Sequence, residues 1–407
     1  MVQNTKKVFI YRGIKVLYQD FIPSGDRKLK PLVVLPGHLH TEKNIMSMIT
    51  ALSKFSPVIL VEMPGWGENS SHALNDVDSA DILAKFFEER GLRGANLLAL
   101  GDSTAMAYFF AYMYPRWPGK LVLSGVAARL RDAVRTLFKG NVEALANGKQ
   151  ESFITGMHSG ILNHSKRTQI QNYQLAKESL YETLKVETAN EDPENGINRL
   201  NRYLTRDDLP DGVKVPTLLI AGEYDPYTSV HDHLLVARRC ESAHLAVISG
   251  TDHLCVIQKP NEFSMTVLSF LVKGSVSPMA GVRVHDSNEI PGYLRQIYPR
   301  VHLDEIGFIE SKSGAPIPIN IKDMNIYGCQ LFTLFSKHRA FNETRLTLRL
   351  TTSDVEDFKL DLSFFSQNRG TFKGVFHHTS MDLLESLETM LERFQQENTK
   401  KHSLISA

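Results

Sequence analysis

The chain has 407 residues, a length that suggests two or three domains at roughly 150 residues per domain. Hydrophobic residues make up 42% and charged residues 22% of the chain, a composition that argues against global disorder. The 46 Lys and Arg residues nearly balance the 45 Asp and Glu residues. A protein without excess positive charge has no electrostatic footprint for DNA, RNA or an anionic membrane surface.

The cysteine content and the lengths of the apolar runs indicate the cellular compartment of the protein. Cys240, Cys255 and Cys329 are odd in number and lie outside any C-x-x-C pattern. A disulfide framework and a thiolate metal cluster are therefore not expected, which suits a reducing compartment. No run approaches the roughly 18 to 20 apolar residues that cross a bilayer. We expect a cytoplasmic protein that is not an integral membrane protein.

The first two thirds of the chain predict an α/β fold. After a hairpin at residues 8–21, short apolar runs alternate with helical segments, at residues 32–35, 58–61, 97–100, 121–123, 218–221 and 245–248. This alternation is typical of a mostly parallel sheet covered by helices on both faces. The interval between residues 125 and 216 is too long for a simple crossover and is mostly helical in pattern. We expect a helical cap at about 126–212, over the site.

The pattern changes after a helix near residues 260–272. Residues 274–292 are rich in Gly, Ser, Pro and Asn, as in a linker. Strand-like segments and then a helical apolar stripe at residues 383–394 follow it. The sequence therefore predicts a first domain at 1–273, a linker at 274–292, and a second domain at 293–407 that forms a small β-barrel with a terminal helix.

A candidate nucleophile lies between a predicted strand and a predicted helix. In Gly101-Asp102-Ser103-Thr104-Ala105 a serine has small residues two positions away on both sides. A nucleophile elbow needs such small neighbours because the strand and helix backbones come close together. Ala105 stands where glycine is usual. We expect Ser103 to be the nucleophile.

Two further loops supply a candidate acid and base in the expected order. Asp225 follows the apolar run at 218–221, and His253 follows the run at 245–248. Carboxyl ends of parallel strands meet at one sheet edge, so Ser103, Asp225 and His253 are expected to meet there. Glu223 or Asp252 could compete for the acid's role. Taken singly, His253 could instead be a surface or capping residue, and Asp225 a turn residue.

An acyl-transfer site also needs two donors for the oxyanion. The backbone N–H groups of Thr104 and His38 are the candidates, because Thr104 follows the nucleophile and His38 follows the first central strand. The His38 imidazole is expected to line the pocket. His38 and His40 have no third ligand at metal spacing, so no metal is expected.

Residues 1–273 resemble an α/β-hydrolase on these motifs. Residues 62–67, Glu-Met-Pro-Gly-Trp-Gly, also resemble the family's D-x-P-G-x-G loop, with Glu62 for Asp. Pro36-Gly37 replaces the usual His-Gly. Within that family, the chain resembles the enzymes that join two 3-hydroxyacyl chains in rhamnolipid synthesis. This likeness rests on residues 13–16, 222–228 and 250–253.

The resemblance implies a reaction. Ser103 would be acylated from a carrier or coenzyme A thioester, and the 3-hydroxyl of another acyl chain would attack the acyl-enzyme. With water as the acceptor, the same site would be a thioesterase or esterase. The acceptor depends on how far the closed site excludes water. No cofactor is implied for this chemistry.

The second domain resembles a PilZ domain, the bacterial receptor for cyclic di-GMP. Arg295 and Arg300 resemble its R-x-x-x-R segment, although they are one residue too far apart. Asp323, Asn325 and Gly328 resemble its [D/N]-x-S-x-x-G motif, with Asn for Ser. The likeness implies that cyclic di-GMP binds these five residues. Alternatively, the arginines are solvated linker residues and the domain is an interaction module.

Two hypotheses follow for the whole chain. The first is a serine-dependent acyl transferase or hydrolase that the C-terminal domain regulates through cyclic di-GMP. The second is a non-enzymatic effector, in which a hydrolase-like scaffold relays the second messenger to a protein partner.

Overall fold

The computed structural model describes residues 2–3, 6–22, 29–65, 74–286, 300–310, 315–334, 341, 345–352, 355–368 and 370–405. The chain divides into two compact units. The first comprises Met1–Leu130 and Lys166–Ile297, and the second comprises Arg131–Ser165 and Tyr298–Ala407. None of the helices in the described part of the chain is both long and apolar enough to cross a bilayer.

The first unit is built on one mixed sheet with the order β1-β3-β5-β4-β6-β7-β8-β9-β10, and β2 pairs with β3. The six central strands, in the sheet order β5-β4-β6-β7-β8-β9, are all parallel to their neighbours. Strands β3 and β10 pair antiparallel with β5 and β9. The strands are β1 (Val2–Gln3), β2 (Lys7–Tyr11), β3 (Ile14–Ile22), β4 (Leu32–Leu35), β5 (Val58–Glu62), β6 (Ala95–Leu100), β7 (Pro118–Ser124), β8 (Thr217–Gly222), β9 (Ala243–Ile248) and β10 (Val282–Asp286). The parallel strands are buried on both faces, which explains their continuous apolar runs. The predicted α/β fold is confirmed.

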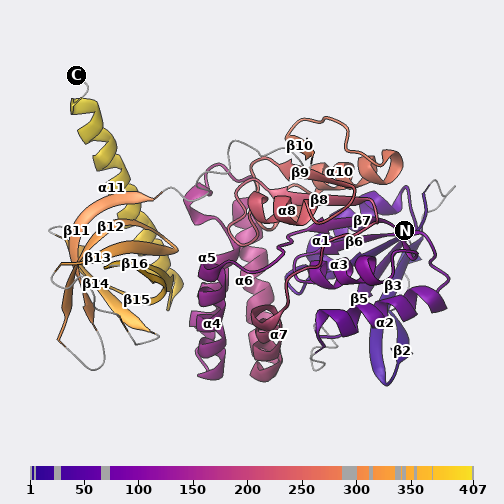
Figure 1. Cartoon of the computed structure of the whole chain (residues 1–407), viewed down its shortest axis with the longest axis horizontal. Coiled ribbons are helices and arrows are strands. Elements are labelled where there is room, and N and C mark those ends of the chain that lie inside the picture. The colour runs from indigo at the N-terminus through magenta and orange to yellow at the C-terminus, as the bar shows by residue number, and fades with distance from the viewer. Residues whose placement is uncertain are drawn as a thin grey trace. The chain divides into compact units, whose positions relative to one another are not determined.

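Helices cover both faces of this sheet (Figure 1). Helices α2, α3 and α8 share one hydrophobic core with alternate strand residues such as Leu97 and Ala99, whereas α1 packs with α9 and α10. The helices of this unit are α1 (Glu42–Ser53), α2 (Asp76–Glu89), α3 (Ser103–Met113), α6 (Tyr173–Asn190), α7 (Pro193–Thr205), α8 (Val230–Ala237), α9 (Cys255–Gln258) and α10 (Pro260–Lys273). A capping box between Ser229 and Asp232 starts α8 directly after the loop that carries Asp225.

Part of the predicted linker at 274–292 belongs to the sheet. Residues 282–286 form β10, which pairs antiparallel with β9 over its whole length. The segment Val-Arg-Val-His-Asp places Val282 in a buried position at the sheet edge, and the ladder pairs the backbone groups that face β9. Residues 287–292 lie outside the described residues.

The second unit contains a closed antiparallel barrel with the order β11-β12-β13-β16-β15-β14. Its strands are β11 (Val301–Glu310), β12 (Ile317–Asn325), β13 (Gly328–Thr333), β14 (Leu346–Thr352), β15 (Val355–Asn368) and β16 (Thr371–His377). Helix α11 (Met381–Ile405) lies against the barrel (Figure 1) and places Leu384, Leu387 and Met390 in its core. The predicted β-barrel with a terminal helix is confirmed.

The second unit also includes two of the helices that we expected in a single cap at 126–212. Helices α4 (Asp132–Ala146) and α5 (Gln150–Ile161) group with the barrel, whereas α6 and α7 belong to the first unit. The Tyr327 hydroxyl donates a hydrogen bond to the Leu162 carbonyl at 2.8 Å. A Cβ at Gly140 of α4 would lie 2.1 Å from Nδ1 of His377. The absence of a side chain at Gly140 thus lets α4 pack directly on β16.

Two adjacent buried histidines make this unit sensitive to acid. Burial lowers the pKa of His377 to about 3 and that of His378 to about 4. The pKa of each histidine in the unfolded chain is near 6.5. Below that pH the unfolded chain therefore binds more protons than the folded chain, and the free energy of unfolding falls as the pH drops toward the folded pKa values. We expect each histidine to contribute up to about 1.4 kcal/mol of lost stability per pH unit.

Urea unfolding of the full chain between pH 7 and 4, followed by a signal from the barrel, measures this loss. The His378→Gln variant should show a shallower pH dependence than the wild type. An equal slope in both proteins would contradict the prediction.

Candidate active site

The structure brings Asp225 and His253 together at the carboxyl edge of the sheet. Nδ1 of His253 donates to Oδ2 of Asp225 at 2.9 Å, and both side chains are buried. The backbone N–H groups of Tyr227 and Thr228 each donate to the other carboxylate oxygen at 2.8 Å. The Thr228 hydroxyl also donates to Oδ2 of Asp225 at 2.8 Å. Asp225 is therefore an oriented, fully hydrogen-bonded partner for the imidazole.

This pairing shifts both pKa values toward the charged forms. Burial acts to lower the pKa of His253, but the charge of Asp225 and the hydrogen bond to it outweigh burial and raise that pKa. Burial acts to raise the pKa of Asp225, and the interaction with His253 lowers it overall. The geometry is that of a base and its orienting acid.

The two carboxylates that could have competed with Asp225 are engaged elsewhere. Glu223 accepts a hydrogen bond from the backbone N–H of Gly250 at 2.8 Å and pairs with Arg283. Asp252 accepts from Nε2 of Gln258 at 2.8 Å and from the backbone N–H of Leu254 at 3.2 Å. Both stabilise the loop that presents His253.

Ser103 is not brought to His253. It is the first residue of α3 and is completely buried. Its hydroxyl lies 2.7 Å from the carbonyl oxygen of Leu35 and 3.0 Å from that of Leu100, so its one proton is shared between these two acceptors. The side chain therefore joins the ends of β4 and β6 to the start of α3. The expected nucleophile–base contact between Ser103 and His253 is absent from the described structure.

At the end of β6, the residue beside His253 is Gly101. It follows β6 directly and has a left-handed φ of +54°, the strained turn expected of an elbow. A Cβ at Gly101 would lie 4.0 Å from Nε2 of His253 and 3.3 Å from Cε1 of His40. A hydroxyl one bond further out would reach the base, and Nε2 of His253 has no hydrogen-bond partner among the described residues. Gly101, two residues before Ser103, thus has the backbone turn and the proximity to His253 that were expected of Ser103.

The sequence does contain a signal for this register. Residues 99–103, Ala-Leu-Gly-Asp-Ser, also have a small residue two positions before and two after the central one. The motif is normally recognised by its serine, and the central residue of this second pattern, Gly101, has no nucleophilic side chain.

The two N–H groups predicted to bind an oxyanion are both hydrogen-bonded within the protein. The N–H of Thr104, predicted as one donor, instead donates to the Gly101 carbonyl at 3.1 Å within the first turn of α3. The N–H of His38, predicted as the other, donates to Oδ1 of Asp102 at 2.8 Å. Both predicted donors are therefore occupied by groups of the chain itself.

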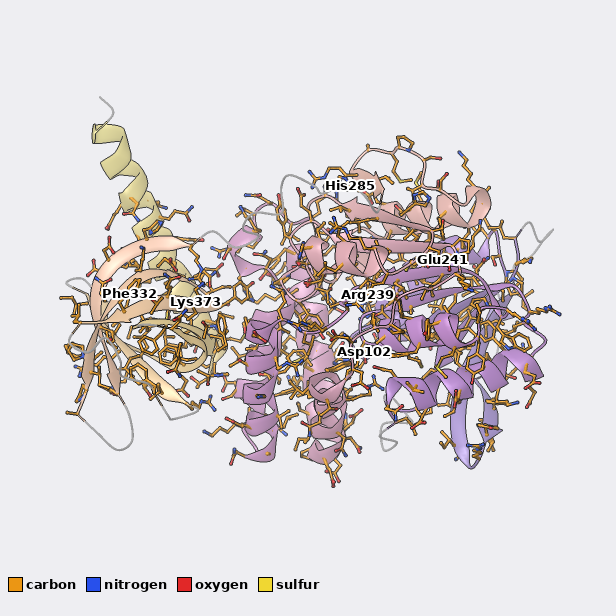
Figure 2. All side chains as sticks on the ribbon, viewed as in Figure 1. Asp102, Arg239, Glu241, His285, Phe332 and Lys373 are labelled. Atoms are coloured by element: carbon orange, nitrogen blue, oxygen red, sulfur yellow. The ribbon has the colours of Figure 1, made fainter. Side chains whose placement is uncertain are left out.

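Asp102, which is labelled in Figure 2, lies in the turn between β6 and α3, beside Gly101. Its other carboxylate oxygen lies 3.2 Å from Nδ1 of His38 and 3.9 Å from Nη2 of Arg202 on α7. Burial acts to raise the pKa of Asp102, but the interactions with His38 and Arg202 hold it well below its ordinary value. Burial lowers the pKa of nearby His40 to about 3, so this imidazole is neutral. The elbow thus carries a buried anion.

The motif residues of the barrel have clear local roles. Arg300 forms an ion pair with Asp323 across the β11–β12 ladder. Oδ1 of Asn325 accepts from the backbone N–H groups of Tyr327 at 3.0 Å and Gly328 at 3.1 Å, which closes the β12–β13 turn. A Cβ at Gly328 would lie 1.9 Å from the Gly374 carbonyl, so this position needs glycine for strand packing.

Two predicted features fall in parts of the chain that the structure does not describe. Arg295 lies outside the described residues, as do residues 66–67 of the loop that begins at Glu62. Within the part of the chain that the structure describes, no group of three His, Cys, Asp or Glu side chains could hold a metal.

Comparisons with known proteins agree with this fold. A family model described as TAP-like protein (Abhydrolase_4) matches residues 199–282. The α/β-hydrolase MGS-M2 from a Medee basin deep-sea metagenome library is 19% identical, with a TM-score of 0.59, over 67% of this chain and 100% of that chain. A thermophilic esterase from Thermogutta terrifontis is 19% identical, with a TM-score of 0.55, over 67% and 99%.

A third solved structure, the enol-lactonase from Burkholderia xenovorans LB400, is 15% identical, with a TM-score of 0.56, over 66% of this chain and 100% of that chain. No curated protein matches the chain in sequence. At these identities the likeness establishes the fold: the chain combines an α/β-hydrolase fold with a separate closed antiparallel β-barrel.

The Asp225→Asn variant tests the electrostatics of the pair. Because the charge of Asp225 and its hydrogen bond raise the pKa of His253 against burial, loss of that charge should bring this pKa below 6.5. A pH titration by NMR, with histidine labelled at Cε1, measures the shift. The signal of His378 in the barrel is the internal control and should titrate as in the wild type. An unchanged His253 pKa would contradict the assigned pairing.

Proposed function

We propose that this chain is a non-enzymatic effector built on an α/β-hydrolase scaffold, and that its barrel unit receives the signal it relays to a protein partner. The observation that carries the proposal is the glycine at the nucleophile position. Serine-dependent acyl transfer requires a hydroxyl within hydrogen-bond reach of the base. Gly101 has no side chain to supply that group.

The surroundings of Ser103 also support this proposal. To act as the nucleophile, Ser103 would have to leave its hydrogen bonds to the Leu35 and Leu100 carbonyls and unwind the start of α3. These carbonyls lie at the ends of buried strands, where unsatisfied backbone groups are costly. Ser103 is better explained as a structural residue.

The competing function is serine-dependent hydrolysis or acyl transfer on hydroxyacyl esters or thioesters. The Asp225–His253 pair favours it, and two of the similar solved structures are a hydrolase and an esterase. Hydrolase-type chemistry without a serine would need the pair to activate an external nucleophile such as water. That route lacks the covalent acyl-enzyme.

Labelling with a fluorophosphonate probe separates the two functions. We expect the intact mass of the wild-type protein to remain unchanged after incubation, and the Ser103→Ala variant to behave in the same way. A serine hydrolase incubated in parallel shows that the probe is active. A single adduct that Ser103→Ala abolishes would overturn the proposal and return the chain to acyl chemistry.

The chain connection between the two units gives a signal a route. Helices α4 and α5 group with the barrel, and the chain reaches α4 directly from the end of β7. The residue after β7, Gly125, lies beside His253, because a Cβ at Gly125 would be 2.8 Å from Cε1 of His253. The N–H groups of Gly125 and Val126 donate to Nε2 of His233 at 3.1 and 3.2 Å. A shift of α4 would therefore act on the segment beside the base.

Cyclic di-GMP is the candidate signal. Arg300 supports it, because a half-buried guanidinium just before β11 offers planar donors for a phosphodiester or a guanine edge. Asp323 holds that guanidinium from the neighbouring strand. Asn325 and Gly328 shape the turn beside them.

Titration calorimetry with cyclic di-GMP tests this second assignment. Loss of one charge-assisted contact in Arg300→Ala should weaken binding about 10- to 150-fold, which corresponds to about 1.5–3 kcal/mol. The matched control is Arg349→Ala, which removes the same charge from β14, where Arg349 pairs with Glu310. This control should bind as the wild type does. Absence of binding to the wild-type chain, or equal loss in both variants, would contradict the assignment.

A further inference from the structure

The backbone N–H that an acyl substrate would need at this site is already bonded. The N–H of His38 donates to Oδ1 of Asp102 at 2.8 Å. A Cβ at Gly37 would lie 2.3 Å from the same oxygen. The carboxylate therefore fills the space directly against residues 37–38. In an acyl-transfer site a substrate carbonyl oxygen would take this hydrogen bond.

Groups from two parts of the first unit hold the carboxylate there, and further ion pairs fix the arginine among them. His38 lies in the loop after β4, and its Nδ1 is 3.2 Å from Oδ2 of Asp102. Arg202 on α7 lies 3.9 Å from the same oxygen and 3.9 Å from Asp76 at the start of α2. Arg199, one turn before Arg202, pairs with Glu191 at 3.1 Å. A carboxylate enclosed by these groups has a fixed position and a persistent negative charge.

We propose that Asp102 is a built-in occupant of the oxyanion position, and that it excludes the carbonyl oxygen of esters and thioesters. This inference rests on the proposed function, because it takes Gly101 as the nucleophile position. It adds a second, separate block to acyl chemistry. The carboxylate uses the N–H of His38, and its charge repels the negative charge that develops on a carbonyl oxygen under attack. Asp102 thus prevents ester and thioester carbonyl groups from binding at this site.

Restoring the nucleophile shows whether the second block exists. Gly101→Ser places a hydroxyl beside His253 on a backbone that already has the φ of an elbow. Its Cβ would need His40 to move by only a few tenths of an ångström. The experiment compares Gly101→Ser with the double variants Gly101→Ser/Asp102→Ala and Gly101→Ser/Asp102→Asn. The Asn variant is the matched control, because it removes the charge and keeps an acceptor for the N–H of His38.

The readout is the rate of fluorophosphonate labelling, with peptide mass mapping to assign the adduct to residue 101 or residue 103. We expect Gly101→Ser/Asp102→Ala to label at residue 101 about 100-fold faster than Gly101→Ser, since loss of one oxyanion donor costs about that factor. Gly101→Ser/Asp102→Asn should stay closer to Gly101→Ser. Asp102→Ala alone should not label.

Equal rates for Gly101→Ser and Gly101→Ser/Asp102→Ala would overturn the inference. Folded variants that all fail to label would overturn it as well, because residue 101 would then not face the base. An adduct on Ser103 of the wild-type protein is a different failure. It would overturn the proposed function, and peptide mapping would still report the rates at residue 101.

A measurement on the wild-type chain covers the case in which Asp102→Ala does not fold. The amide proton of His38 lies in a loop but is bonded to a buried carboxylate. We expect it to exchange with solvent at least about 100-fold more slowly than an unbonded loop amide, as measured by NMR. The Asp102→Asn variant should retain part of this protection. Unprotected exchange in the wild type would show that Asp102 does not hold this position, and would overturn the inference.

Discussion

The left-handed turn at Gly101 sets the geometry on which the whole site depends. It follows β6, precedes α3, and would place a Cβ at residue 101 within 3.3 Å of Cε1 of His40 and 4.0 Å of Nε2 of His253. Parallel strands deliver their following loops to one sheet edge, so the loops after β8 and β9 bring Asp225 and His253 to the same place. The α/β-hydrolase fold therefore brings Asp225 and His253 together beside a residue that has no side chain.

Buried charge is the second constraint on this site. Asp102 and Asp225 both remain ionised inside the first unit because each has close cationic or hydrogen-bonding partners. A buried carboxylate without such partners would cost several kcal/mol. The arrangement ties α7 to the elbow through Arg202 and ties the β9 loop to the β8 loop through His253. These pairs favour one fixed arrangement of the loops and of the helix that covers them.

The division of the cap gives the second unit a direct connection to the chain around the site. Helices α4 and α5 follow β7 in sequence but pack with the barrel, where Gly140 accommodates His377 and Tyr327 binds the Leu162 carbonyl. The polypeptide thus passes from the sheet into the barrel unit and back. Packing of this kind joins segments by shape, because a small residue on one element receives a large one on another.

The sequence by itself determined the α/β sheet, the barrel with its terminal helix, and the pairing of Asp225 with His253. These features depend on apolar periodicity and on the order of strand ends, which are local or follow from sheet topology. Tertiary structure alone decided that Gly101 and not Ser103 faces the base, because a shift of two residues fits the same pattern of small residues. It also decided that Asp102 takes the N–H of His38 and that α4 and α5 join the barrel. Contacts between residues far apart in the chain leave no periodic signal in the sequence.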